Sequence, residues 1–300
     1  MTDLPQILHQ IRTQQIQRIV VLVGAGISTA AGIPDFRTPG SGLYDQLQPL
    51  RHLLPYPEAL FSLSYFKHTP EPFYAIARAR HPRTLRPTRT HAFLLLLSRK
   101  NLLHFLFTQS TRCWKCGTAC PDSKMREAVR MGAVPYCSVA ECEGGVVKPD
   151  VVFFGEEIPP EYAEREAVVR EAELMLVLGT SLKVAPCSQL PRLVREGVPR
   201  VLVNREAAGD LGKRPGDVCV LGDCDDGVCE LAEALGWRGE LEEVWRDAVR
   251  RVEVQLEQEN WGEELSLEVL VEQYARSVAD ARLVLESHLG KKLASIRGRD

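Results

Sequence analysis

The sequence lacks the features that would tie it to a membrane or to nucleic acid. No apolar run approaches the roughly 18 residues that a membrane span needs, and residues 1–15 (MTDLPQILHQIRTQQ) lack the core of a signal peptide and the character of a transit peptide. A net charge of −3 over 300 residues indicates no general affinity for nucleic acid. We therefore expect a cytoplasmic or nuclear protein that binds neither partner directly.

The composition is that of an ordinary globular protein with an unusual set of cysteines. A hydrophobic fraction of 45% and a charged fraction of 26% are typical values, and 300 residues suffice for one large domain or two small ones. The nine cysteines are an odd number, and four of them have the spacing of metal ligands. In a reducing compartment this pattern favours zinc over disulfides.

The four spaced cysteines predict one structural zinc ion. Cys113 and Cys116 form the first pair, and Cys137 and Cys142 form the second pair after twenty intervening residues. Each pair can place two thiolates on one cation, and four thiolates complete a tetrahedral site with no open position for catalysis. Cys120 could replace Cys116 in the first pair, but we favour Cys116.

The stretch from Ile19 to Arg37, IVVLVGAGISTAAGIPDFR, has the pattern of a strand followed by a cofactor loop. Ile19–Val23 predicts a strand that is buried on both faces. Gly24 and Gly26 allow a sharp turn and a close approach to a ligand, and the small residues that follow could begin a helix whose free N–H groups face an anion. A third glycine is missing at the usual spacing, so an ordinary turn remains an alternative.

Further apolar runs end in polar or glycine-rich residues, as the strands of a ligand-binding parallel sheet do. Helical stretches separate these runs, which indicates an α/β fold, a doubly wound Rossmann-like parallel sheet that binds ligands at the carboxyl ends of its strands. The predicted strands after the first are 102–107, 174–178, 201–203 and 218–221.

GAGIS followed by GIPDFR resembles the cofactor loop of the sirtuins, the NAD-dependent protein deacylases. Further similar segments are Gly42–Asp45, Pro87–His91, Gly145–Glu156 and Ala232–Trp237. The resemblance implies a sirtuin-type domain over residues 1–237, with a helical insertion at about 38–90 and a zinc module at about 110–147. Residues 238–300 lie beyond it and predict a solvated helical extension; self-association or autoinhibition through this extension is an alternative.

The resemblance also implies which residues bind NAD and the acetylated peptide. His91 matches a helix-start position and not a catalytic one. The NAD-binding residues so implied are Gly24, Ala25, Gly26, Ile27, Ser28, Thr29, Asp35, Phe36, Arg37, Gln109, Gly179, Thr180, Ser181, Asn204, Arg205, Glu206 and Cys224. The implied peptide-binding residues are Val152, Phe153, Phe154, Gly155 and Glu156, which would pair with an extended acetyl-lysine substrate and line its lysine tunnel.

The catalytic part of the sirtuin pattern is absent. In the family, the residues matching Thr108 and Gln109 are followed by asparagine, isoleucine and aspartate, and later by a histidine–glycine pair that supplies the general base. Here Ser110, Thr111 and Arg112 lead directly to Cys113, and none of the seven histidines precedes a glycine. We therefore assign no catalytic residue. Because the missing segment supplies a strand in the family, we also expect a sheet that lacks a central strand and exposes two edges.

The resemblance implies a transferase that moves acetyl from lysine to ADP-ribose as NAD is cleaved. A general base typically contributes about 10²–10⁴ in rate, so we expect this chain to be impaired or inactive. Three hypotheses follow: an exon-skipped or incorrectly assembled version of a sirtuin deacetylase, which we favour; a catalytically dead protein that binds NAD or acetylated peptide; and a zinc-stabilised interaction module.

Overall fold

The computed structural model describes residues 3–47, 54–79, 86–107, 111–131, 133–149, 152–157 and 161–258. The chain divides into two compact units. The sheet unit comprises Met1–Gln46, Pro82–Gln109 and Glu157–Asn260, and the cysteine unit comprises Leu47–His81, Ser110–Glu156 and Trp261–Asp300. Both units are therefore built from segments that lie far apart in the sequence.

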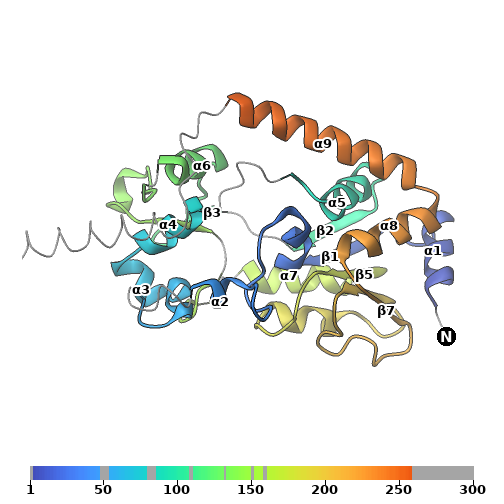
Figure 1. Ribbon diagram of the computed structural model, residues 1–300. Helices are drawn as coiled ribbons and strands as arrows, with labels where there is room; N and C mark the ends of the chain where they lie inside the picture. Colours follow the sequence, from blue (N-terminus) through green and yellow to red (C-terminus); the bar gives the residue numbers. More distant parts are fainter. Residues whose placement is uncertain are drawn as a thin grey trace, which may run out of the picture. The chain divides into compact units, whose positions relative to one another are not determined.

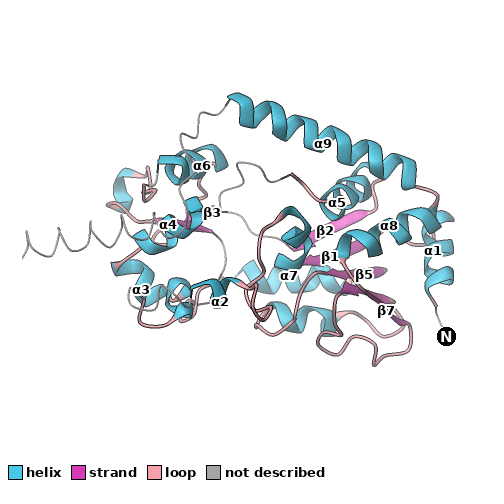
Figure 2. Ribbon diagram, viewed as in Figure 1, coloured by secondary structure: helices cyan, strands magenta, loops and turns pink. Residues whose placement is uncertain are grey.

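A five-stranded parallel sheet forms the centre of the sheet unit (Figure 2). Its strand order is β2-β1-β5-β6-β7, which confirms the predicted doubly wound α/β fold. The strands are β1 (Ile19–Val23), β2 (Leu103–Phe107), β5 (Leu174–Leu178), β6 (Arg200–Asn204) and β7 (Asp217–Leu221).

The described sheet is continuous, so the expected loss of a central strand is wrong. β1 pairs directly with β2 on one side and with β5 on the other, without a gap between them. Among the described strands, β2 is the edge next to β1. Its side chains are only partly covered, with His104 exposed and Phe105 and Phe107 half-buried.

Helices cover both faces of this sheet (Figure 1). Successive side chains of a strand point to opposite faces, and here the side chains on both faces are apolar and buried. Ile19 and Val21 of β1 pack on the face with α1, α5, α8 and α9, whereas Val20 and Leu22 pack on the opposite face with α7 and η5. The covering elements are α1 (Leu4–Arg12), α5 (Arg89–Arg99), α7 (Glu161–Arg170), η5 (Cys187–Leu193), α8 (Cys224–Leu235) and α9 (Arg238–Gln258).

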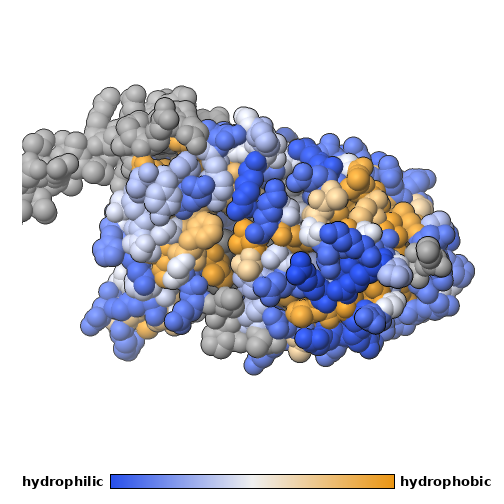
Figure 3. Space-filling view, turned by 90° about the horizontal axis from the view of Figure 1, so that it is seen from below, coloured by the Kyte–Doolittle hydropathy of each residue, from blue (hydrophilic) through white to orange (hydrophobic). Residues whose placement is uncertain are grey.

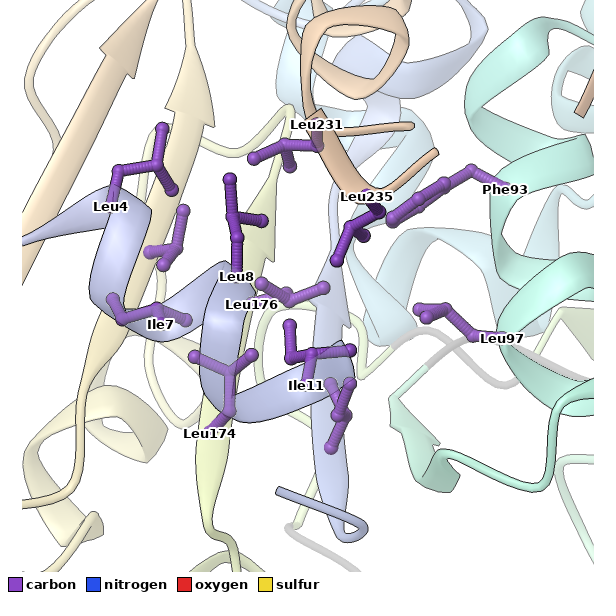
Figure 4. Close-up of a pocket in the computed structure, with 12 residues that line it drawn as sticks. Leu4, Ile7, Leu8, Ile11, Phe93, Leu97, Leu174, Leu176, Leu231 and Leu235 are labelled. Atoms are coloured by element: carbon purple, nitrogen blue, oxygen red, sulfur yellow. The ribbon is translucent and has the colours of Figure 1, made fainter. Parts of the chain in front are cut away.

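The N-terminal helix α1 closes the core on one face of the sheet. The Asp3 carboxylate accepts a hydrogen bond from the Gln6 N–H at 2.9 Å and so caps the helix. Ile7, Leu8 and Ile11 are buried and point toward the sheet and α8 (Figure 4). The apolar crevice among them has a volume of about 10 Å³, which is roughly the room that one water molecule needs. It is a packing defect and not a ligand site.

The fold continues past Trp237 into α9, which packs along α5. The Trp245 indole N–H donates to the Pro87 carbonyl at 2.8 Å, and Arg89 pairs with Glu242 at 2.8 Å. Lys100 pairs with Glu240 at 2.7 Å near the other end of α5. The predicted extension is therefore helical up to Gln258, and the remainder of it, residues 259–300, lies outside the described residues.

The cysteine unit joins the helical insertion to the cysteine-rich segment through a shared core. Phe66 and Tyr74 from the insertion pack with Val129, Val146 and Phe153. The Tyr74 hydroxyl donates to the Val147 carbonyl, so the two segments are also hydrogen-bonded. The elements are η3 (Pro57–Phe61), α3 (Leu63–His68), α4 (Glu71–Ala79), β3 (Thr111–Cys113), α6 (Asp122–Met131), η4 (Ala140–Cys142) and β4 (Val147–Pro149), with α2 (Leu43–Leu47) preceding them. β3 and β4 pair antiparallel.

No helix within the described ranges combines the length and apolarity that crossing a membrane requires.

A buried ion pair ties β6 to β7. Arg200 has no exposed surface, and its guanidinium donates two hydrogen bonds to Asp217, at 2.8 Å and 2.7 Å. It also donates to the Pro191 carbonyl at 2.9 Å and to the Asp210 carboxylate at 3.2 Å. Burial raises the pKa of Asp217, but hydrogen bonds from Arg200 and the Arg214 N–H outweigh burial and leave the pKa below its ordinary value.

We expect Asp217→Asn to lower the free energy of unfolding by about 1.5–3 kcal/mol, because the buried Arg200 loses two charge-assisted hydrogen bonds and keeps only the longer contact to Asp210 as counter-charge. Urea unfolding at neutral pH measures this effect, and Asp226→Asn, at an exposed aspartate of α8, is the control. The folded pKa of Asp217 is lowered, so its contribution is complete above the ordinary aspartate pKa of about 3.9 and is lost as pH falls through the folded pKa. A wild-type stability curve with the same acid dependence as that of the Asp217→Asn variant would contradict this assignment.

Candidate functional site

The carboxyl ends of four neighbouring strands are joined by backbone hydrogen bonds. Each bond links the turn after one strand to the end of a neighbouring strand or to the turn that follows it, so the loops after the strands start from one edge. The bonds run from Gly24 N to Leu178 O (3.0 Å), Gly26 N to Gly179 O (2.8 Å), Gly179 N to Val203 O (3.0 Å) and Gly222 N to Asn204 O (3.0 Å). This is the edge at which parallel sheets bind ligands.

The glycines of the first turn are required by the neighbouring turn. A Cβ atom on Gly24 would lie 2.4 Å from the Gly179 carbonyl oxygen, and one on Gly26 would lie 2.7 Å from it. Gly179 itself has a φ of +58° and leaves no room for a side chain beside Ile27. The glycine pattern therefore reflects backbone packing within the protein, in addition to the predicted approach to a ligand.

The loop after β1 contains a 3-10 helix, η1 (Ala25–Ala31), followed by an ordered turn. Asp35 organises this turn: its carboxylate accepts the Thr38 N–H at 2.9 Å, the Arg37 N–H at 3.2 Å and the Thr38 hydroxyl. Burial raises the pKa of Asp35, but these hydrogen bonds outweigh burial and lower it. The exposed Arg37 guanidinium lies 5.9 Å from the centre of the Tyr44 ring. Asp35 thus holds the loop in one conformation, whereas the exposed Arg37 places a positive charge at the surface of the loop.

The loops after β5, β6 and β7 carry the predicted adenosine-side residues. Asn204 is nearly buried, and its amide donates to the Glu206 carbonyl at 2.8 Å. Arg205 pairs with Asp223. The Cys224 thiol, at the start of α8, donates to the Val203 carbonyl at 3.4 Å. Burial, with the charges of Asp225 and Asp223 adding to it, raises the pKa of Cys224 to about 11, so this thiol stays neutral near pH 7.

The sheet unit therefore brings the predicted cofactor residues to loops at one sheet edge. Thr180 is ordered by its own loop, since its hydroxyl accepts the Leu182 N–H at 3.3 Å. Gln109 lies outside the described residues. Sequence reasoning missed Thr88 and Asp225, whose hydrogen bonds reach the loop after β1 and the start of α5. Asp225 directly follows the predicted site residue Cys224, but adjacency alone does not show which helix it contacts.

His91 has the structural role that the sequence predicted. It occupies the third position of α5, where its ring accepts the Thr88 N–H at 3.3 Å and Thr88 accepts the His91 N–H in return. Burial lowers the pKa of His91, against the opposing charge of Asp225, so the ring is neutral near pH 7. A buried, neutral imidazole whose Nδ1 is engaged in a helix cap has a structural role.

The four predicted zinc ligands converge in the cysteine unit. The sulfur atoms of Cys113, Cys116, Cys137 and Cys142 all lie within 4.8 Å of one another. Two of the pairs, Cys113–Cys142 at 3.5 Å and Cys116–Cys137 at 3.7 Å, are near the roughly 3.8 Å expected for tetrahedral Zn–S bonds of about 2.3 Å. Cys120 is not in this group, and its thiol lies beside the Pro121 carbonyl. The cluster fits one structural zinc ion.

Backbone groups around the cluster also fit a zinc site. The Lys115 N–H points at the Cys113 sulfur at 3.4 Å, and the Val139 N–H points at the Cys137 sulfur at 3.5 Å. Such donors stabilise thiolates and orient them for the metal. A Cβ atom on Gly145 would lie 2.6 Å from the Cys113 sulfur, so only glycine fits there.

The predicted peptide-binding segment is held by the helical insertion. Phe154 N donates to the Phe61 carbonyl at 2.7 Å, and the Phe154 carbonyl accepts the Leu63 N–H at 3.0 Å. Phe153 is 2% exposed within the aromatic core, whereas Phe154 is 48% exposed. The alternation matches the predicted division into an inward face and an outward face. Apolar side chains also reach the surface among charged ones on the face drawn in Figure 3.

Glu156 fixes the end of this segment. Its carboxylate accepts the Phe153 N–H at 2.8 Å and pairs with the buried Lys148 at 2.9 Å. The Lys148 ammonium also donates to the Pro149 carbonyl at 3.1 Å and lies 4.7 Å from the centre of the Phe153 ring. These contacts hold the segment in one shape on the cysteine unit.

Comparison with known proteins decides the family. The Sir2 family model matches residues 24–111 and 109–186. The NAD-dependent protein deacetylase hst2-2 of Emericella nidulans is 46% identical over 334 residues, which cover 99% of this chain and 94% of the relative. The chain belongs to the Sir2 family. Other sirtuin relatives include mouse NAD-dependent protein deacetylase sirtuin-3, 42% identical over 265 residues covering 80% of this chain and 78% of the relative.

A third sirtuin gives the same result. The NAD-dependent protein deacetylase hst2 of Schizosaccharomyces pombe is 41% identical over 266 residues, which cover 80% of this chain and 79% of the relative. The predicted resemblance to sirtuins is thus confirmed. The relatives' names support NAD as the predicted cofactor, and the four-cysteine cluster supports the predicted structural zinc.

Purified wild-type chain should contain one zinc ion, and Cys116→Ser should reduce zinc content at least tenfold, because the tetrahedral thiolate set is broken. Cys120→Ser is the matched control and should keep its zinc, since Cys120 lies outside the cluster. Elemental analysis by mass spectrometry measures both variants. Equal zinc loss in the Cys120→Ser variant would contradict the ligand assignment.

Gly26→Ala should destabilise the sheet unit by about 1–3 kcal/mol, because its Cβ would overlap the Gly179 backbone and force the two turns apart. Gly239→Ala in α9 is the matched control, since a Cβ there meets nothing within 4 Å. Alanine is also the better helix former, so this control should be neutral or up to about 1 kcal/mol more stable. Chemical unfolding of both variants tests the difference, and an unaffected Gly26→Ala variant would refute the packing constraint.

Proposed function

We propose that this chain is a sirtuin-type protein that binds NAD and acetylated peptide, and whose protein-lysine deacetylase activity is impaired. The carrying observation is that the predicted NAD loops and the predicted peptide segment are both ordered, while the segment that bears the family's general base is missing between Gln109 and Cys113. On this proposal, the encoded function is that of a sirtuin deacetylase and the chain as written is a defective version of it.

The sheet edge supports the NAD part of the proposal. Glycine turns and polar side chains follow β1, β5, β6 and β7, and the backbone bonds between these turns fix them before any ligand binds. Preorganised loops bind with less loss of conformational entropy. Asn204, Glu206 and Cys224 would hold the adenosine half of NAD, and Arg37 would face its phosphates.

The cysteine unit supports the peptide part. The Val152–Glu156 segment is anchored by Phe61 and Leu63 on one side and by Lys148 through Glu156 on the other. An anchored extended segment is a suitable edge for strand addition by a substrate peptide. The exposed Phe154 ring would pack on the substrate's lysine stem. The zinc ion would stabilise this small unit without entering the reaction.

Two features of the comparisons support a missing segment, and the first of them bears on its position. The family match consists of two pieces that meet at residues 109–111, just after β2. The comparison with hst2-2 runs over 334 residues although this chain has 300, so at least 34 of its positions have no residue here. This chain therefore contains the segments that match the family on both sides of residues 109–111, and a segment that relatives have between them would be missing.

No described histidine is placed to replace the missing base. His91 is engaged in the cap of α5, and His104 on β2 pairs with Glu171 at 3.3 Å. His9 and His68 lie on α1 and α3, within elements that carry no predicted NAD-binding residue. Loss of a general base alone typically reduces a rate by about 10²–10⁴, and loss of the nicotinamide pocket removes orientation as well.

A catalytically dead binder is the second candidate. The same ordered loops favour it, because binding needs the loops but not the base. The two candidates differ in what the gene encodes, and transcripts distinguish them: coding sequence between the Gln109 and Cys113 codons supports the deacetylase, and its absence supports the binder. A cluster of free cysteines is consistent with a protein of the cytoplasm or nucleus, where thiols stay reduced.

The purified, zinc-loaded chain should release deacetylated product from an acetyl-lysine peptide at least about 100-fold more slowly than a full-length relative does. Mass spectrometry of the peptide, with and without NAD, measures the rate. A variant with a relative's segment inserted between Gln109 and Cys113 should regain NAD-dependent turnover. Turnover by the unmodified chain at a relative's rate would refute the impairment.

Calorimetry provides the control for binding. We expect the unmodified chain to give a heat of binding with NAD, because the adenosine-side loops are present. No heat with either NAD or acetylated peptide would remove the binding part of the proposal and leave a zinc-stabilised interaction module.

A further inference from the structure

The first turn of α5 is held by a carboxylate from another helix. Asp225 lies in the first turn of α8, and its side chain reaches the start of α5. One oxygen accepts the Arg89 N–H at 3.0 Å, and the other accepts the Thr90 N–H at 2.9 Å and the Thr90 hydroxyl at 2.7 Å. Thr90 has no exposed surface, so these are interior contacts.

This arrangement divides the capping of α5 between two residues. The first N–H groups of a helix have no partner within the helix and are usually capped locally. Here Thr88, the N-cap residue, serves the His91 N–H, at 3.4 Å. Asp225 serves the two N–H groups between them, and its negative charge lies at the favourable end of the α5 dipole. The position of α5 is thereby tied to that of α8.

The same turn of α5 holds the loop after β1. The Thr88 hydroxyl, on a residue that is 4% exposed, donates to the Ile27 carbonyl at 2.9 Å. Ile27 lies in η1, between Gly26 and Ser28, in the middle of the predicted NAD-binding residues. The Thr88 oxygen also lies 2.7 Å from His91 Nδ1, so the Ile27 carbonyl and the His91 ring share the Thr88 hydroxyl group. Hydrogen bonds therefore tie Asp225 to the first turn of α5, and the residue before that turn, Thr88, ties it to the loop after β1.

Asp225 also adjoins the opposite side of the predicted site. It follows Cys224, whose thiol is bonded to the Val203 carbonyl next to Asn204. Asp225 thus lies just after the loop that follows β7, and its side chain contacts the turn of α5 that is bonded to the loop after β1. Its carboxylate oxygens face donors of α5 within the described part of the chain, so its position is explained by contacts inside the protein and not by a predicted ligand contact.

We infer that Asp225 is a positioning residue of the NAD site. It fixes the first turn of α5 so that the Thr88 hydroxyl holds η1 in the shape that receives NAD. The inference rests on the proposed function for its ligand, but the ordering of η1 by Asp225 is a property of the protein without NAD. α9 supports the same turn, since Trp245 bonds to Pro87 and Arg89 pairs with Glu242.

Asp225→Asn tests the inference with the smallest change of shape. The amide keeps one acceptor, but its NH₂ group faces one of the two N–H donors of α5, so one bond is replaced by a repulsive contact. Asp226→Asn is the matched control, since Asp226 is the next residue and is exposed. We expect amide hydrogen exchange in residues 25–31 to be roughly tenfold faster in the Asp225→Asn variant, with no change in the Asp226→Asn variant.

The second measurement is the affinity for NAD by calorimetry. The Asp225→Asn variant should bind roughly tenfold more weakly than wild type, and zinc content should not change. Thr88→Val should weaken binding similarly, whereas Thr88→Ser should retain the wild-type affinity because the hydroxyl is kept. The double variant Asp225→Asn with Thr88→Val should be no weaker than the single variants, since both changes break the same chain of bonds.

The outcomes separate the inference from the proposed function. Unchanged exchange in residues 25–31 of the Asp225→Asn variant, or additive effects in the double variant, would overturn the inference. If wild type gives no heat with NAD while exchange in residues 25–31 responds as expected, the proposed function fails and the positioning role of Asp225 stands. If exchange rises throughout the sheet in the Asp225→Asn variant, the two Thr88 variants decide, because a role in η1 requires that Thr88→Val increases exchange there and Thr88→Ser does not.

Discussion

The close packing of two backbone turns is the constraint on which the predicted cofactor site depends. Gly24 and Gly26 follow β1, and their backbone lies so near the Gly179 carbonyl that no Cβ atom fits between them. This contact aligns the loop after β1 with the loop after β5, and the bond from Gly179 to Val203 extends the alignment to β6. The site is thus a product of the sheet's own hydrogen bonding, and the side chains on the loops inherit their positions from it.

The cysteine unit achieves order by different means. Its described residues include a short antiparallel pair, β3 and β4, and a small aromatic core around Phe66 and Phe153. Small units bury too little apolar surface for high stability and often need a metal. Four converging thiols, with a glycine that leaves them room, form a site for such a metal. The same unit holds the Val152–Glu156 segment through the ion pair of Lys148 and Glu156. Zinc and peptide binding would therefore be coupled through stability and not through chemistry.

On the proposed function, the missing segment would change the chemistry of this chain more than its described fold. β2 ends at Phe107 and remains paired with β1, so the described sheet keeps its order and both of its helical layers. A loss beside an edge strand removes no pairing between the other strands, which explains why five strands still form one sheet. On the proposed function, the base and the nicotinamide contacts would belong to the lost residues alone. Folding and catalysis would then depend on different parts of the chain.

The sequence by itself determined the five strands of the parallel sheet, the cysteines that form the zinc cluster and the family. Apolar runs such as Leu174–Leu178 and the spacing of cysteines are local patterns, and local patterns predict strands and metal ligands without knowledge of the tertiary structure. Only the tertiary structure decided the order of the strands, the burial of Arg200 against Asp217, and the contact of Asp225 with α5. Asp225 and Thr90 are separated by 135 residues, and no periodicity or propensity relates positions that meet only when two helices pack on the same sheet.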